Sequence, residues 1–102
     1  MVEWEIVFQP KMDDAAKLDE FLALKLDPAY KHRLGHGARV IIDYGLRDKD
    51  ECYRVAEFIR HQSPIGEGLR YMVSGREGTT YKFLSYCPKC RKGDEGFHDE
   101  HS

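Results

Sequence analysis

The first residues of the chain alternate between apolar and polar side chains. Trp4, Ile6 and Phe8 would share one face of an extended segment. The opposite face would carry Glu3, Glu5 and Val7. A period of two is typical of a strand with one buried face. We therefore predict a strand over residues 3–9, which Pro10 ends.

Two later segments repeat apolar residues at three- and four-residue steps, the period of an amphipathic helix. Over residues 12–26 the apolar stripe consists of Ala15, Leu18, Phe21, Leu22 and Leu26. Over residues 48–62 it consists of Cys52, Val55, Ala56 and Ile59. Asp48, with Glu51 three residues later, resembles a capping box at the start of the second segment. The pattern predicts two long helices, with Cys52 as a small buried hydrophobe.

The segment at residues 28–34 allows two interpretations. Asp27-Pro28 resembles a helix N-cap followed by a first-turn proline, which favours a short helix. The rival interpretation is a short strand over residues 30–34 that turns through residues 35–37 into the next strand. We favour the helix.

Three further strands are predicted. Residues 38–44 are rich in β-branched side chains, which favour strands. Residues 69–74 and 79–86 also alternate, and the glycines within residues 75–78 predict a hairpin between them. A loop containing proline and glycine, residues 63–68, separates the second long helix from this hairpin.

These elements define a single small α/β or α+β domain in the order β-α-α-β-α-β-β. We expect an open, mixed, four-stranded sheet with the helices packed on one face. If residues 30–34 form a strand, the order becomes a ferredoxin-like βαββαβ plus one extra strand, which is the alternative architecture. We place an α/β sandwich domain at residues 1–86 and a Cys/His zinc knuckle or tail at residues 87–102.

The composition argues against some classes of function. The chain has 102 residues, 33% of them charged, and 16 basic residues nearly balance 18 acidic ones. This balance argues against strong non-specific binding to nucleic acid, which requires a basic surface. No apolar run is long enough for a membrane span, and the acidic N-terminus is unlike a secretory signal, so we expect a cytoplasmic protein without membrane contact.

The only spacing that predicts a specific chemistry lies near the C-terminus. Cys87 and Cys90 are three residues apart, and His98 and His101 follow with the same separation. Paired cysteines and paired histidines can supply the four corners of a tetrahedral zinc site. The linker between the pairs is shorter than that of a typical zinc finger, so we expect a compact knuckle. The competing interpretation is a polar tail over residues 91–102.

We therefore expect a non-enzymatic binding or regulatory module that contains structural zinc and recognises a protein partner. Such a module would be an inhibitor or adaptor of a larger complex, and the pattern is also compatible with a homo-oligomer. One alternative is a thiol–disulfide oxidoreductase that uses the dithiol of Cys87 and Cys90. A second alternative is a protein that binds single-stranded nucleic acid through Arg39, Arg70 and Lys82.

The second alternative requires exposed aromatic rings beside these basic residues. Tyr71, Tyr81, Phe83 and Tyr86 alternate with Arg70, Lys82 and Arg39 in the predicted sheet. Their rings would stack bases if they faced solvent. At a period of two, however, we expect the aromatic rings to face the helices and the basic side chains to extend outward.

Overall fold

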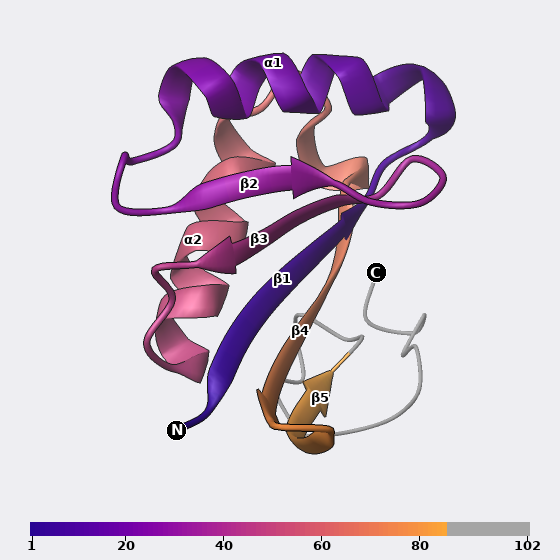
Figure 1. The fold of residues 1–102 in the computed structure, drawn as a ribbon. Coiled ribbons are helices and arrows are strands. Elements are labelled where there is room, and N and C mark those ends of the chain that lie inside the picture. Colours follow the sequence, from indigo (N-terminus) through magenta and orange to yellow (C-terminus); the bar gives the residue numbers. More distant parts are fainter. Residues whose placement is uncertain (86–102) are drawn as a thin grey trace.

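The computed structural model describes residues 1–85. Five strands and two α-helices make up this part of the chain (Figure 1). The strands are β1 (Glu3–Gln9), β2 (Lys31–Leu34), β3 (Val40–Tyr44), β4 (Arg70–Glu77) and β5 (Thr80–Ser85). The helices are α1 (Ala15–Lys25) and α2 (Lys49–Gln62), with short 3₁₀ turns at η1 (Met12–Asp14) and η2 (Gly66–Gly68). None of the helices among residues 1–85 is long and apolar enough to cross a membrane.

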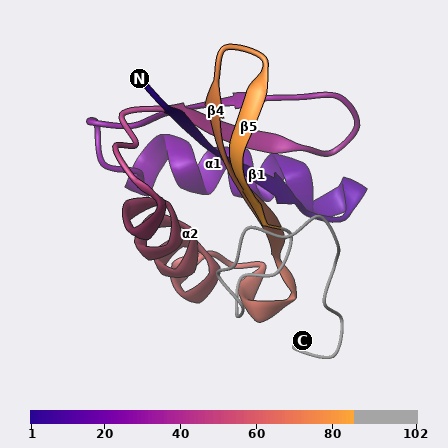
Figure 2. The same ribbon diagram turned by 90° about the horizontal axis from the view of Figure 1, so that it is seen from below.

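The strands form one sheet in the order β2-β3-β1-β4-β5, and every neighbouring pair is antiparallel. Both helices lie on the same side of this sheet, which is clearest when it is seen edge-on (Figure 2). The predicted α+β class and one-sided helix packing are confirmed. The predicted mixed, four-stranded sheet is wrong, because residues 1–85 form a sheet of five strands in which every neighbouring pair is antiparallel.

The difference arises at residues 28–34, where the favoured helix is wrong. Asp27 forms a turn instead of a helix cap: its side chain accepts a hydrogen bond from Ala29 N at 2.8 Å, and its carbonyl accepts one from Tyr30 N at 2.9 Å. An aspartate before a turn and an aspartate at a helix cap use the same side-chain acceptor, so sequence does not separate them. Strand β2 follows and pairs with β3.

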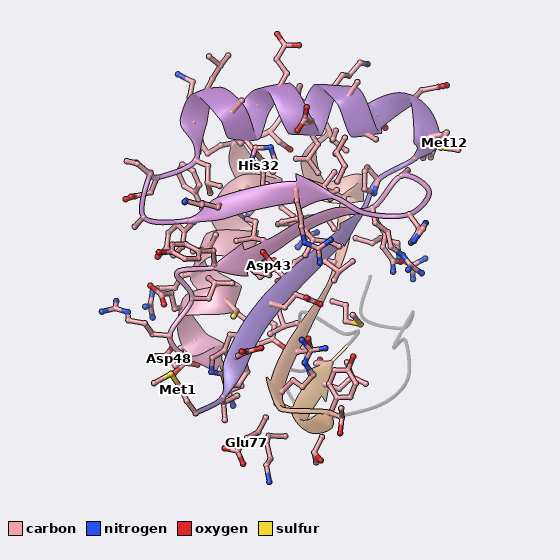
Figure 3. The ribbon with its side chains drawn as sticks, viewed as in Figure 1. Met1, Met12, His32, Asp43, Asp48 and Glu77 are labelled. Carbon is pink, nitrogen blue, oxygen red and sulfur yellow. The ribbon has the colours of Figure 1, made fainter. Side chains whose placement is uncertain are left out.

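Contacts with both helices hold this turn and strand in place. Tyr30 donates a hydrogen bond to Glu51 on α2 at 2.6 Å. His32 lies 2.8 Å from Asp19 on α1, between β2 and that helix (Figure 3). These contacts join residues that are 21 and 13 positions apart in sequence, so no local pattern reveals them.

With β2 in place, the element order is the βαββαβ of the ferredoxin-like alternative, followed by one extra strand. Strand β3 lies between β1 and β2, which separates the two strands that run in the same direction. All hydrogen-bonded neighbours are therefore antiparallel. Strand β5 extends the sheet at its other edge by pairing with β4.

The final hairpin is predicted correctly, but its turn lies further along the chain. Strand β4 continues through Gly75 to Glu77, and Gly78 adopts a φ of 63° in the turn. Gly75 stays in the strand because the Trp4 ring packs directly on it. A Cβ atom at Gly75 would lie 2.7 Å from the Trp4 ring. A glycine within a strand can mark such a close approach as well as a turn.

The core lies between the helices and one face of the sheet. Both predicted helices are confirmed, and the Asp48 side chain accepts the Glu51 backbone N–H at 2.8 Å to cap α2. Trp4, Phe83, Tyr53 and Tyr71 form a continuous line of aromatic contacts, with ring centroids 5.8 to 6.5 Å apart. The buried residues of the core are Ile6, Phe8, Leu18, Leu22, Val40, Ile42, Cys52, Tyr53, Ala56, Ile59, Leu69, Tyr71 and Val73.

Candidate functional site

The four predicted zinc ligands lie outside the described residues. Cys87, Cys90, His98 and His101 all follow Ser85, the last residue of β5. Within residues 1–85, histidine, cysteine, aspartate and glutamate side chains do not gather in threes or more in a way that would hold a metal ion. The zinc site therefore stays a prediction from sequence.

The third cysteine is structural, as its position in the helical stripe predicts. Cys52 is fully buried in α2. Burial raises the pKa of its thiol to about 12, and the nearby Glu51 and Asp48 carboxylates act in the same direction. A thiol with such a pKa is protonated at neutral pH and is a poor nucleophile or metal ligand.

The three predicted nucleic-acid contacts do not form a single patch. Arg70 pairs with Gln9 at the end of β1, and Arg39 precedes Val40 at the same end of the sheet. Lys82 lies next to Phe83, which pairs with Gly75, about 17 Å further along β4 at the rise of an extended strand. All three side chains are exposed.

Two aromatic rings of the same strands, Tyr71 and Phe83, face the core as expected, whereas Tyr81 does not. Tyr71 is 2% exposed, and its hydroxyl donates to Glu57 on α2 at 2.6 Å. Phe83 packs between Trp4 and Tyr53. Of the four predicted stacking residues, Tyr86 lies outside the described residues, and only Tyr81 of the other three is largely exposed. Tyr71 and Phe83 are therefore unavailable to stack on a base.

The face of the sheet opposite the helices changes from apolar to charged side chains along its length. Where β1 pairs with β3 and β4, Val7 lies beside Ile41 and Met72 and forms an apolar strip. Two residues closer to the N-terminus along β1, the same face carries charged side chains from four strands. These are Arg33 on β2, Asp43 on β3, Glu3 and Glu5 on β1, and Arg76 on β4. Asp43 faces the viewer in front of the sheet (Figure 3).

These charged residues line a cavity of about 180 Å³. The lining residues are Glu3, Trp4, Glu5, Arg33, Asp43, Ser74, Arg76 and Tyr81. The two arginines are engaged with carboxylates at the margins: Arg33 Nε donates to Asp43 Oδ2 at 2.8 Å, and Arg76 Nη2 lies 3.7 Å from Glu3 Oε2. The Arg33 side chain keeps about half of its surface exposed.

Two acceptors that line this cavity have no hydrogen-bond donor within the part of the chain that the structure describes. Glu5 is half-buried, and Ser74, directly opposite it on β4, is 3% exposed. Within residues 1–85 neither the Glu5 carboxylate nor the Ser74 hydroxyl makes a hydrogen bond or close ion pair. Burial raises the pKa of Glu5, and the Asp43 charge raises it further, against the opposing effect of Arg76 and Arg33. Both residues line the cavity, so a ligand there can reach them.

The alternation along β1 predicts the correct face for Glu5, but no local pattern indicates the cavity. Its residues come from five strands that span most of the chain, and their convergence depends on the position of β2. The available signal was the alternation of Glu3, Glu5 and Val7, which predicts a polar face but not its neighbours.

Comparison with protein-family models, curated protein sequences and solved structures finds no significant match to this chain. Its function is therefore inferred from the chemistry of its own residues.

Proposed function

We propose that this chain is a non-enzymatic binding module that recognises a protein partner through the helix-free face of its sheet. The observation that supports this proposal is the one-sided packing of the helices. In the described part of the chain no helix packs on the opposite face, which carries a charged cavity beside apolar side chains, of which Val7 and Ile41 are only 5% and 8% exposed. The exposed side chains of Glu3, Arg33 and Arg76 around this cavity offer charges that a partner of complementary charge would recognise.

We further propose that Cys87, Cys90, His98 and His101 hold a structural zinc ion. The cysteine pair begins two residues after β5, an edge strand that pairs only with β4 in the described sheet. Zinc bound there would contribute its binding free energy to folding in a chain with a small core. The spacing of the four ligands in the sequence supports this proposal.

Metal analysis of untagged protein tests the zinc proposal. We expect about one zinc ion per chain, because a closed structural site is nearly full at neutral pH. Cys87→Ser and His98→Ala should each lose most of the metal, whereas His36→Ala should keep it, since His36 is an exposed residue of the β2–β3 turn. Less than about half an equivalent of zinc in the wild type would contradict the site.

The same preparation separates zinc binding from the dithiol alternative. Zinc-bound thiolates react slowly with a thiol reagent until a chelator is added, whereas a catalytic pair reacts at once. Immediate reaction of Cys87 and Cys90 in metal-free protein, together with disulfide reductase activity, would support the oxidoreductase instead. Cys52 is buried and should react only after unfolding.

Crosslinking to cellular proteins tests the recognition surface by comparing two charge reversals. Arg76→Glu changes the sheet face, and Arg54→Glu changes an exposed position on α2. Partners captured by the wild type and by Arg54→Glu but lost from Arg76→Glu would support the proposal. Equal capture by both variants would contradict it. Capture of single-stranded nucleic acid that weakens steeply with salt would support the nucleic-acid alternative.

A further inference from the structure

We propose that the cavity between β1 and β4 binds the guanidinium or ammonium end of a cationic ligand, with Glu5 as its counter-ion and Ser74 as a hydrogen-bond acceptor. A cationic ligand would thus bind on the helix-free face of the sheet described above. It rests on the proposed function only where the cation is taken to be an arginine or lysine side chain of a protein partner. The same chemistry would also accept a small free amine or guanidine.

The charge of the cavity favours a cation. Its lining contains three carboxylates and two guanidinium groups, which leaves one net negative charge. Arg33 and Arg76 lie against Asp43 and Glu3, so the carboxylate without a close partner is Glu5 at the centre. A ligand with one positive charge would neutralise the cavity and give Glu5 the ion pair that the described residues do not supply.

The hydrogen-bonding groups point to the same ligand. Ser74 is 97% buried by the fold, and no described residue bonds its hydroxyl, which lines the cavity opposite Glu5. Residues directly opposite each other on antiparallel strands have Cβ atoms about 5 Å apart, so one group with several N–H donors can reach both. Guanidinium carries five such donors and ammonium three.

Size and shape are also compatible. A cavity of about 180 Å³ is slightly larger than the roughly 150 Å³ cavity that accepts benzene in another protein, and a guanidinium group is smaller than that ring. Tyr81 contributes an exposed aromatic ring to the wall. Aromatic faces attract cations, so this wall would favour the same ligand.

A titration of labelled protein with methylguanidinium, followed by amide NMR shifts, tests the inference. We expect saturable shifts at the cavity strands with a dissociation constant on the order of 1–10 mM, as suits one small ion pair. Glu5→Gln should weaken binding by at least about tenfold, and Ser74→Ala by about threefold to tenfold. The matched control is Glu20→Gln on the exposed side of α1, which should bind as the wild type does.

The pH dependence gives a second readout. Glu5 is surrounded by Asp43 on β3, Arg33 on β2, Arg76 on β4 and Glu3 on its own strand. Because burial raises the pKa of Glu5, this residue should protonate before an exposed carboxylate does as the pH falls. Binding of methylguanidinium should weaken over the same pH interval.

Further arms of the titration identify the source of the cation. Binding of both methylguanidinium and N-acetyl-arginine amide supports a protein side chain as the ligand. Binding of methylguanidinium alone supports a small free cation. Absence of saturable shifts up to about 100 mM, unchanged binding in Glu5→Gln, or binding of acetate at the same residues would overturn the inference. None of these results affects the zinc content or the crosslinking comparison, so the proposals fail separately.

Discussion

A half-buried glutamate lies on each side of the sheet, Glu57 on α2 and Glu5 on β1, and the two carboxylates differ in their hydrogen bonding. On the helix side, Glu57 accepts hydrogen bonds from Tyr71 at 2.6 Å and from Arg60 at 2.9 and 3.1 Å. On the opposite side, Glu5 is half-buried without a hydrogen bond to any described residue. Burial acts to raise the pKa of both groups.

The net pKa shift differs between Glu57 and Glu5. At Glu57 the hydrogen bonds from Tyr71 and Arg60 outweigh burial, and the pKa falls below its ordinary value of 4.5. At Glu5 burial and the Asp43 charge prevail, and the pKa rises. The helix side of the sheet therefore uses its carboxylate for stability. The other side keeps a carboxylate at some cost to stability, which is typical of a binding site.

The largest expected effect comes from removing core volume on the helix side. Phe8 is fully buried and packs against the Tyr71 ring at 5.9 Å. Phe8→Ala should lower the free energy of unfolding by about 3–5 kcal/mol, through lost burial and the cavity left behind. Gln9→Ala, the next residue and on the opposite face, should change it by less than about 0.5 kcal/mol. Urea denaturation of both variants measures the contrast, and similar losses in both would contradict it.

A smaller effect is expected from the hydrogen bond that stabilises Glu57. Tyr71→Phe removes the donor at 2.6 Å, and hydrogen bonds to a charged group contribute about 1.5–3 kcal/mol. Because Arg60 still bonds the carboxylate, we expect a loss near the lower end, about 1.5 kcal/mol at pH 7. Tyr81→Phe, at an exposed position, is the matched control.

The pH dependence of this loss follows from the lowered pKa of Glu57. A carboxyl group with a depressed folded-state pKa adds stability above its unfolded pKa, near 4.5, and loses it as pH falls through the folded value. The difference between wild type and Tyr71→Phe should therefore shrink in acid. Urea denaturation at several pH values measures it. A difference that stays constant with pH would show that Tyr71 acts through packing alone.

The helix side of the molecule is predictable from sequence because its signals are local. The stripe of Cys52, Ala56 and Ile59 and the cap at Asp48 each lie within one element, and the structure confirms them. The helix predicted after Asp27 is wrong because a helix cap and a turn use the same side-chain acceptor.

The cavity depends on strand order, which no single segment specifies. Glu5 and Ser74 lie opposite each other although 69 positions separate them, and Arg33 reaches Asp43 only when β2 is a strand. An alternating segment predicts which side chains share a face, but the identity of the neighbouring strand depends on the whole fold. The predicted zinc ligands rest on spacing alone and lie beyond the described residues.

The smallest expected effect has the opposite sign and completes the contrast between the two faces. A carboxyl group whose folded-state pKa is raised destabilises the fold when it is ionised, so its penalty is present above the folded pKa and absent below about 4.5. Glu5→Gln should therefore raise the free energy of unfolding at pH 7, by on the order of 0.5 kcal/mol because the group is only half-buried. This gain should disappear in acid, where the wild-type side chain is itself neutral. A loss of stability at pH 7 would mean that the Glu5 charge is already satisfied within the fold, and the cavity would then have no reason to bind a cation.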